Sequence, residues 1–295
     1  MKKTMGLFLS IALLVVLAAC GGVNNTSNTN NEINTNSGTA SNGAADQGEQ
    51  NNQGEKTTLS VAATPVPHAE ILKFVAPMLE EQGIELEIKE FTDYVQPNVQ
   101  VNESAIDVNF FQHQPYLDQF NTDNGMNLIS VAGIHVEPFG GYSDRITSLD
   151  ELKEGAVVAI PNDPTNGGRA LLLLEQQGLI TLNPEAGINA TLKDIEQNPQ
   201  NLDIKEFEAA MLPRMLRDVD LALINTNYAL EADLVPTEDA LFIEGSESPY
   251  VNILVSTPAL AKSEAVQKLA EVLKSEETKA YILDQYEGAV VPAGE

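Results

Sequence analysis

One arginine stands where a turn-forming stretch gives way to an apolar helix. In PNDPTNGGRALLLLEQQG, residues 161–178, Arg169 follows a run of Asn, Asp, Pro, Thr and Gly and comes just before four consecutive leucines. A guanidinium group binds a carboxylate through two parallel, charge-assisted hydrogen bonds. A positive charge at the start of a helix is unfavourable, because the helix dipole is itself positive there. Arg169 therefore either reaches solvent beside an ordinary connector or binds an anion.

Strands and helices alternate along the chain around this arginine. We expect helices at 67–82, 114–120, 261–274 and 277–285, besides the leucine-rich one, and strands or extended segments at 59–64, 84–88, 107–111, 131–139, 157–160, 219–224, 240–243 and 251–255. This alternation predicts an α/β fold whose sheets are covered by helices on both faces. Ligands in such folds bind where loops leave the carboxyl ends of the strands.

The first residues indicate export. Lys2 and Lys3 precede an apolar run at 6–18 that is too short to span a membrane comfortably, and Leu17-Ala-Ala-Cys20 follows it. Cys20 is the only cysteine, so it forms no disulfide within the chain. Its position resembles the lipobox of bacterial lipoproteins, in which the signal peptide, here 1–19, is removed and the cysteine is acylated. We expect a protein anchored to the cell membrane by lipid on its extracytoplasmic side; an ordinary secretory signal is the alternative.

Composition separates the anchor from a folded body. Residues 20–57 are rich in Asn, Gly, Ser, Thr and Gln and contain no aromatic residue, which predicts a disordered linker after the lipidated cysteine. The body from residue 58 onward is long enough for two lobes. The net charge of −27 argues against binding of nucleic acid or of an anionic bilayer by the folded surface.

Five segments of the body occur in a fixed order. They are Asp107-Val-Asn-Phe-Phe-Gln-His113, Glu137-Pro-Phe-Gly-Gly-Tyr-Ser143, Ile160-Pro-Asn-Asp-Pro-Thr-Asn166, Leu223-Ile-Asn-Thr-Asn-Tyr228 and Glu247-Ser-Pro-Tyr-Val-Asn252. With the lipobox, they resemble the methionine-binding lipoproteins of bacterial ABC importers, the NlpA family. The resemblance implies a two-lobed periplasmic-binding-protein-like fold of type II with two crossovers, one lobe at 58–139 plus 249–295 and the other at 140–248. It also implies that the protein captures L-methionine and delivers it to an ABC permease.

The same resemblance assigns roles to the polar residues. It implies that Arg169 holds the carboxylate of the ligand, with Asn166 on the same turn, where a helix N-terminus adds free N–H groups. It implies that Asn225 and Asn252 accept hydrogen bonds from the ligand's polar head, although buried amides at these points could instead bond the backbone of turns. Neutral amides suit this role, because a free carboxylate would tend to pair with Arg169.

The pocket for the ligand's side chain is expected from Tyr94, Phe111 and His113. A thioether is polarizable and interacts favourably with the edges of aromatic rings. Alternation along the strand sends Phe110 and Phe111 to opposite faces, and Phe111 shares its face with His113. We therefore expect Phe110 in the core, and His113 as a neutral wall of the pocket rather than a metal ligand.

Other classes of protein fit the residues less well. An anchored hydrolase is disfavoured because neither G-x-S-x-G nor H-E-x-x-H occurs. A metal receptor would have to use His68, His113 and His135, which are scattered in the sequence, so we expect no metal site. A methionine-containing dipeptide or a methionine derivative stays open as the ligand. We expect a receptor without enzymatic activity or cofactor, monomeric apart from its permease partner.

Overall fold

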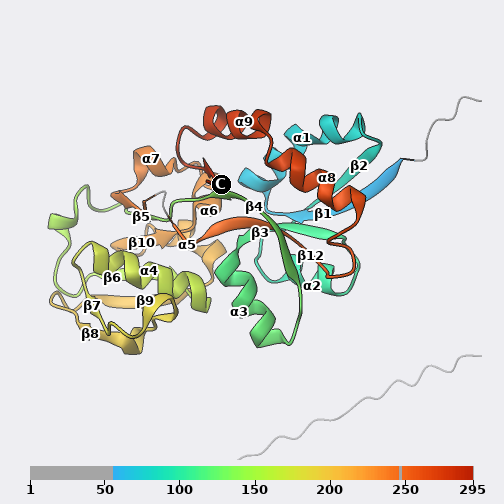
Figure 1. Ribbon diagram of the computed structural model, residues 1–295. Coiled ribbons are helices and arrows are strands. Elements are labelled where there is room, and N and C mark those ends of the chain that lie inside the picture. The colour runs from blue at the N-terminus through green and yellow to red at the C-terminus, as the bar shows by residue number, and fades with distance from the viewer. Residues whose placement is uncertain (1–55, 246–247, 295) are drawn as a thin grey trace, which may run out of the picture. The chain divides into compact units, whose positions relative to one another are not determined.

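The structure is a computed structural model that describes residues 56–245 and 248–294 (Figure 1). The expected signal peptide at 1–19, the lipidation of Cys20 and nearly all of the linker at 20–57 lie outside the described residues. Within the described part, the strands form a six-stranded sheet, a five-stranded sheet and one small two-stranded sheet. None of the helices in this part is long and apolar enough to cross a membrane.

The first sheet has the strand order β13-β4-β12-β3-β1-β2. Its strands are β1 (Thr57–Ala63), β2 (Ile84–Glu90), β3 (Val108–His113), β4 (Ile129–Val136), β12 (Val251–Ser256) and β13 (Val291–Pro292). β1 pairs in parallel with both β2 and β3, whereas β12 is antiparallel to β3 and to β4. Two strands from the C-terminal part of the chain, β12 and β13, therefore complete a sheet whose other four strands come from residues 57–136.

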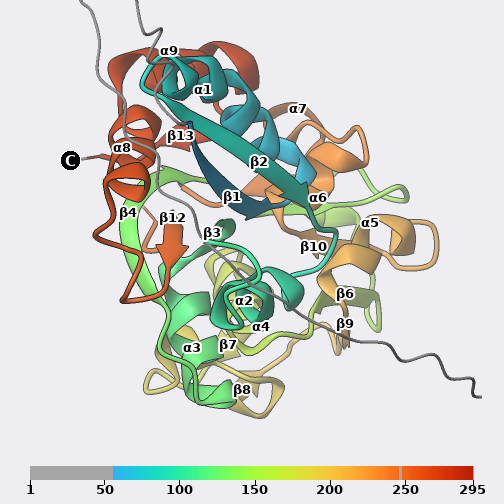
Figure 2. The same cartoon turned by 90° about the vertical axis from the view of Figure 1, so that its right-hand side faces the viewer.

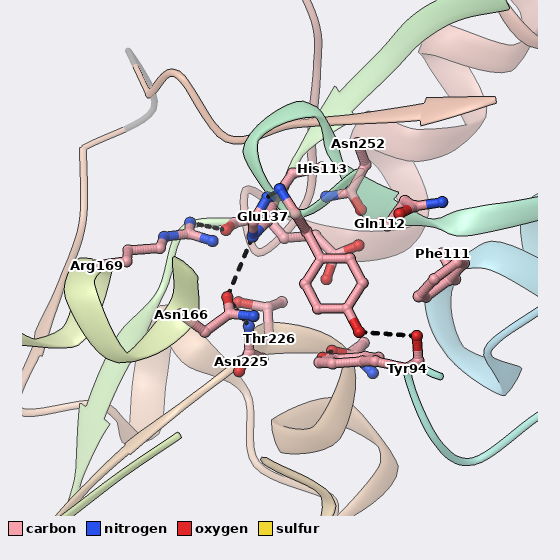
Figure 3. Close-up of a pocket in the computed structure, with 12 residues that line it drawn as sticks. Tyr94, Phe111, Gln112, His113, Glu137, Asn166, Arg169, Asn225, Thr226 and Asn252 are labelled. Carbon is pink, nitrogen blue, oxygen red and sulfur yellow. Dashed lines mark hydrogen bonds between the residues drawn. The ribbon is translucent and has the colours of Figure 1, made fainter. Parts of the chain in front are cut away.

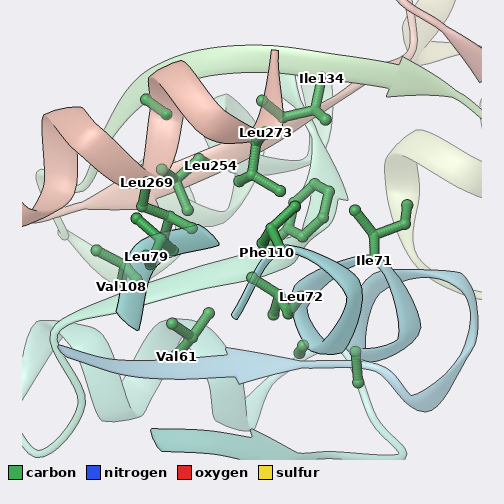
Figure 4. Close-up of a cluster of buried hydrophobic side chains, with 14 of the residues drawn as sticks. Val61, Ile71, Leu72, Leu79, Val108, Phe110, Ile134, Leu254, Leu269 and Leu273 are labelled. Atoms are coloured by element: carbon green, nitrogen blue, oxygen red, sulfur yellow. The ribbon is translucent and has the colours of Figure 1, made fainter. Parts of the chain in front are cut away.

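Helices cover both faces of this sheet (Figures 1 and 2). α1 (Glu70–Glu80), α8 (Glu264–Leu273) and α9 (Glu276–Tyr286) share one apolar cluster with Val61 and Phe110, whereas α2 (Gln96–Asn102) and α3 (Gln114–Asn124) share another with Ala62. Neighbouring residues of β1 thus face opposite sides, as strand geometry requires. Figure 4 shows the larger cluster, in which Phe110 is fully buried.

The second sheet is built in the same way from the middle of the chain. Its strand order is β11-β5-β10-β6-β9, with β5 (Gly140–Tyr142), β6 (Val157–Pro161), β9 (Asp203–Phe207), β10 (Leu221–Ile224) and β11 (Phe242–Ile243). Val158 and Ile160 pack with α4 (Pro164–Gln176), whereas Ala159 packs with α5 (Leu212–Met215) and α6 (Thr226–Glu231). β7 (Thr181–Leu182) pairs with β8 (Ile195–Gln197), and α7 (Pro236–Asp239) precedes β11.

The chain crosses between the two sheets twice, once between β4 and β5 and again between β11 and β12. This is the two-lobed α/β architecture with two crossovers expected from the sequence. The lobe boundaries at 139/140 and 248/249 fall within these two connections, and they remain a proposal.

The start of α4 differs from the loop expected around Asn166. The helix begins at Pro164, so Arg169 lies in its second turn rather than at its N-terminus. Asp163 is the N-cap, and its carboxylate accepts the backbone N–H of Asn166 at 2.9 Å. Proline is well suited to the first helical position, because it has no N–H that would need a partner there. The turn-forming residues thus start the helix instead of preceding it.

Two glycines in α4 allow the helix to lie close to neighbouring backbone. A Cβ atom added at Gly168 would lie 2.5 Å from the carbonyl oxygen of Ile188, and one added at Gly167 would lie 3.0 Å from that of Pro161. The first distance is too short for any carbon atom, whereas the second requires only a small adjustment. Gly168 therefore lets the loop at Ile188 pack directly on the helix that carries Arg169.

We expect Gly168→Ala to destabilise the protein by about 1–3 kcal/mol more than Gly167→Ala, because overpacking against backbone cannot be relieved by a rotamer change. Both replacements gain the same helix propensity, about 1 kcal/mol, so their difference reports how much more severe the contact at Gly168 is than the contact at Gly167. Urea unfolding followed by circular dichroism measures it. Equal free energies of unfolding for the two variants would contradict the packing described.

Candidate functional site

A pocket lies at the carboxyl ends of parallel strands in both sheets. Its empty volume, which includes space open to solvent, is about 350 Å³. Its walls come from the loop after β2, the end of β3 and the start of α3, the connection after β4, the first turns of α4, the residues after β10 and the start of β12 (Figure 3). The lining residues are Tyr94, Phe111, Gln112, His113, Tyr116, Glu137, Asn166, Arg169, Asn225, Thr226, Asn227 and Asn252.

A directed series of hydrogen bonds forms one wall of the pocket. The carboxylate of Asp163 accepts from Nδ2 of Asn166 at 2.9 and 3.0 Å, so Oδ1 of Asn166 faces the opposite way. That oxygen lies 3.1 Å from Nε2 of His113 and accepts Nδ2 of Asn225 at 2.8 Å. Figure 3 shows the bond between His113 and Asn166. Because Oδ1 can only accept, His113 must carry its proton on Nε2.

The other nitrogen of His113 supports the same assignment. Nδ1 accepts the backbone N–H of Tyr116 at 3.1 Å, where it caps α3. Burial, with a smaller effect from the charge of Arg169, lowers the pKa of His113 to about 3. The ring is therefore neutral near pH 7 and donates one hydrogen bond into the pocket wall.

Two amides in the pocket keep an unpaired polar atom. Asn225 donates through Nδ2, but its Oδ1 is buried and has no hydrogen-bond partner among the described residues. Asn227 accepts from the hydroxyl of Tyr94 at 2.6 Å, and its buried Nδ2 likewise lacks a partner among those residues. Most buried polar groups in proteins are paired. One acceptor and one donor are thus available to a bound molecule.

Arg169 is held on several sides. Its side chain is only 3 % exposed; Nε and Nη2 donate to the carboxylate of Glu244, and Nη2 also donates to the backbone oxygen of Glu137 at 2.8 Å. The guanidinium lies over the ring of Tyr250, 4.3 Å from its centroid, and 5.1 Å from that of Phe139. Arg169 is therefore buried rather than directed to solvent, and the anion that it pairs with in the structure is the carboxylate of Glu244. None of these bonds uses Nη1.

Aromatic rings form the wall away from Arg169. The ring of Tyr94 lies 5.9 Å from the rings of Phe111 and Tyr116, and the last two are 6.0 Å apart. The hydroxyl of Tyr116 donates to the backbone oxygen of Tyr94 at 2.9 Å, which fixes the loop after β2 against α3. Phe110, by contrast, lies in the apolar core formed with α1, α8 and α9. The pocket therefore has a polar side and an aromatic side.

Two histidines and a carboxylate converge behind the pocket. Nε2 of His135 lies 2.8 Å and Nε2 of His68 lies 3.3 Å from Oε1 of Glu137. Nε2 of His68 is also 3.2 Å from Oδ1 of Asn252. His68 and His135 are thus brought together rather than scattered, which corrects the sequence-based expectation, while His113 bonds elsewhere. The ligand atoms of His68, His135 and Glu137 lie within 4.8 Å of one another, close enough to hold a metal ion.

The structure brings all the residues expected at the site into one pocket. Tyr94, Phe111, His113, Asn166, Arg169, Asn225 and Asn252 all line it. Five further residues line the pocket that were not expected there from the sequence: Gln112, Tyr116, Glu137, Thr226 and Asn227. All of these except Tyr116 lie in the segments on which the family resemblance rests, so those segments contained them although the resemblance gave them no role. Glu244 lies outside those segments, and no local pattern connects it to Arg169.

The fold and the pocket define the class: a two-lobed binding protein of the periplasmic-binding-protein type, with its site where strands of both sheets end. A model of the NlpA lipoprotein family matches residues 59–294. The chain belongs to this family.

Several relatives are similar over most of the chain. The D-methionine-binding lipoprotein MetQ of Salmonella typhimurium is 47% identical over 211 residues, which cover 71% of this chain and 77% of that protein. A lipoprotein structure from Ruminococcus gnavus superposes with a TM-score of 0.79 at 46% identity, over 81% of this chain and 100% of that one. A nutrient binding protein from Burkholderia cenocepacia, solved bound to methionine, superposes with a TM-score of 0.78 at 42% identity, over 80% of this chain and 100% of that one.

We expect His113 to stay uncharged and protonated on Nε2 at about pH 5, because its pKa is lowered to about 3 and Nδ1 accepts a backbone N–H. Long-range proton–nitrogen NMR spectra of the imidazole rings measure the tautomer. Histidines of the urea-unfolded protein, which should titrate near about 6.5, are the control. A second proton on His113 at that pH, or a proton on Nδ1 alone, would contradict the assignment.

Proposed function

We propose that this protein is an extracytoplasmic receptor that binds L-methionine between its two lobes and delivers it to an ABC importer. The observation that carries the proposal is the pair of buried, unpaired groups in the pocket, the acceptor Oδ1 of Asn225 and the donor Nδ2 of Asn227. Leaving such a group unpaired costs about 1–3 kcal/mol. A free amino acid has an ammonium donor and a carboxylate acceptor that can meet both.

The carboxylate of the ligand binds at Arg169 in this proposal. Glu244 and the backbone oxygen of Glu137 hold Nε and Nη2, so the guanidinium is fixed before a ligand arrives and Nη1 serves the ligand. The bond is charge-assisted, and the donor does not have to be reoriented on binding. Asn166, whose Oδ1 is occupied by His113 and Asn225, then acts by orienting its neighbours.

The ammonium group of the ligand binds beside Asn225 and Asn252. Among the described residues, Oδ1 of Asn225 has no partner and Oδ1 of Asn252 has one, His68, which leaves Asn252 a second lone pair. Asn225 directly follows β10 of the second sheet, whereas Asn252 lies in β12 of the first sheet. A ligand held by both amides stabilises the arrangement in which the lobes are close, because it binds that form better than an open one.

The thioether of the ligand packs on the aromatic side of the pocket. Tyr94, Phe111 and Tyr116 supply ring edges and faces, with which a polarizable sulfur interacts favourably. The names of the relatives support this choice, since the Salmonella protein is called D-methionine-binding and the Burkholderia protein was solved with methionine. The residues that contact the ligand are proposed from the pocket and from the family resemblance.

Membership of a lipoprotein family supports an anchored receptor rather than an enzyme. Acylation of Cys20 and the linker at 20–57 would tether the body to the outer face of the cell membrane, within reach of its permease. We propose that the body acts as a monomer. A methionine-containing dipeptide or a methionine derivative is the alternative ligand.

We expect Arg169→Lys to weaken methionine binding at least about 30-fold, roughly 2 kcal/mol, because an ammonium point charge does not reproduce the planar donor set. Titration calorimetry measures the dissociation constant. Arg145→Lys is the matched control, since Arg145 pairs with Asp220 at 3.0 Å with its side chain 40% exposed. An unchanged affinity in the Arg169 variant would return that residue to a structural role.

We expect methionine to raise the melting temperature more than norleucine does, and N-acetylmethionine to raise it least. Norleucine loses only the modest sulfur–aromatic interaction, whereas the acetylated ligand loses the ammonium group that Asn225 and Asn252 would bond. Differential scanning fluorimetry measures the shifts, and Asn225→Ala should reduce the response to methionine. Equal stabilisation by N-acetylmethionine would instead favour a dipeptide with methionine at its C-terminal end.

A further inference from the structure

Glu137 is the carboxylate that lines the pocket, and it has two histidine neighbours on its buried side. His68 comes from the helical turn Pro65–Ala69 and His135 from β4, and both rings are at most 1% exposed. Their Nε2 atoms lie 3.3 and 2.8 Å from the same oxygen, Oε1. Two rings from different elements are therefore directed at one carboxylate oxygen.

The neighbouring atoms fix the protons of both rings. Nδ1 of His135 is buried without a partner among the described residues, while its Nε2 faces an acceptor, so the proton is on Nε2. Nε2 of His68 faces two oxygens, those of Glu137 and Asn252, and Nδ1 lies 2.7 Å from the hydroxyl of Thr64, which can donate to it. Both rings are therefore neutral and donate from Nε2, and of their four nitrogens only Nδ1 of His135 has no partner among the described residues.

Burial favours these neutral rings. It lowers the pKa of His68 to about 4 and that of His135 to about 3. Burial also raises the pKa of Glu137, while nearby positive charge and the backbone N–H of Asn227 act in the opposite direction. Hydrogen bonds donated to a carboxylate favour its ionised form. The two histidines thus supply donors to a carboxylate that burial would otherwise tend to protonate.

Building on the proposed function, we propose that Glu137 is a third acceptor for the ammonium group of the ligand and that His68 and His135 are its positioning residues. Their Nε2–H groups keep the carboxylate ionised and directed toward the pocket. His68 bonds Asn252 through the same N–H, so one ring aligns two ammonium acceptors. A ligand whose amino group is acylated gains nothing from this arrangement.

The same three side chains are of the kinds that bind zinc. Zinc requires the unprotonated nitrogen of each ring to face the metal, whereas here the protons of both rings lie between nitrogen and carboxylate. The observations therefore favour a hydrogen-bonded cluster, and zinc binding becomes one outcome of the test.

The test compares two substitutions of His135 in the full-length protein. His135→Leu removes the donor and keeps an apolar side chain in a buried place, whereas His135→Gln keeps an N–H near the position of Nε2. Methionine dissociation constants are measured by calorimetry from about pH 5 to about pH 8, the range in which an ordinary histidine gains its proton but the buried histidines of this chain stay neutral. Melting temperatures without ligand show that each variant is folded, and His68→Leu with His68→Gln repeats the comparison.

In the wild type and in His135→Leu, we expect the affinity for methionine to fall below a certain pH. In His135→Leu this pH should be higher by roughly one to two units, and the affinity should fall by up to about tenfold for each pH unit below it. A protonated Glu137 must lose its proton before it can bind an ammonium group. His135→Gln should keep the wild-type profile. Glu137→Gln should bind weakly at every pH, and adding His135→Leu to it should change nothing further.

Other ionisable groups close enough to Glu137 to interact with it electrostatically do not produce this profile. They are the neutral His68 and His135, the guanidinium of Arg169, and the hydroxyls of Tyr94 and Tyr286, whose pKa values burial raises. A His135→Leu protein with the wild-type affinity and profile would overturn the positioning role. Zinc binding by the wild type that Glu137→Gln abolishes would overturn the proton arrangement. Failure of the wild type to bind methionine at all would instead refute the proposed function.

Discussion

The carboxylate of Asp163, which accepts every hydrogen bond it makes, sets the direction of the bonds along one wall of the pocket. It caps α4 through the backbone of Asn166 and holds the Nδ2 of the same residue, so Oδ1 must receive its donors from elsewhere. Those donors are His113, at the end of β3, and Asn225, just after β10. A single N-cap therefore links the start of one helix to strands of both sheets and engages Nδ2 of Asn225, whose Oδ1 has no partner among the described residues.

This link explains why helix geometry and recognition are inseparable here. α4 carries Asn166 and Arg169 and packs Leu171 and Leu174 into the core of the second lobe, so any shift of the helix moves both polar groups. Gly168 brings the helix against the backbone at Ile188. A site whose polar groups must be placed to within a fraction of an ångström is best carried by such a rigid element.

Local rules account for the part of this structure that the sequence predicts well. Alternation separates Phe110 from Phe111, and the amphipathic pattern locates α1, α8 and α9 to within a few residues. The family resemblance located the pocket residues that no periodicity identifies. Short polar elements such as β9 are not predicted from the sequence, because the segment Asp203–Phe207 is mostly exposed and has little apolar character.

Contacts between distant residues account for what the sequence could not indicate. Glu244 pairs with Arg169 from a connection far along the chain, and His68 meets His135 only because β4 and the turn before α1 lie at the same end of the first sheet. The composition of residues 161–168 predicts a turn, but the structure has the first residues of α4 there. The reason is local: a capping Asp followed by Pro starts a helix, although the same residues are common in turns.

The charges of the pocket indicate why a zwitterion suits it better than a simple anion. Arg169 is already paired with Glu244, so an added carboxylate finds a guanidinium whose charge is largely balanced. The remaining buried carboxylate, Glu137, has neutral histidines as its closest partners and therefore lacks a full countercharge at hydrogen-bond distance. Burying an unpaired charge is costly, and in the proposed binding mode the ligand's ammonium group removes that cost while its carboxylate bonds the N–H groups of Nη1 of Arg169. On this argument the ammonium group contributes the larger electrostatic gain and the carboxylate mainly fixes the orientation of the bound molecule.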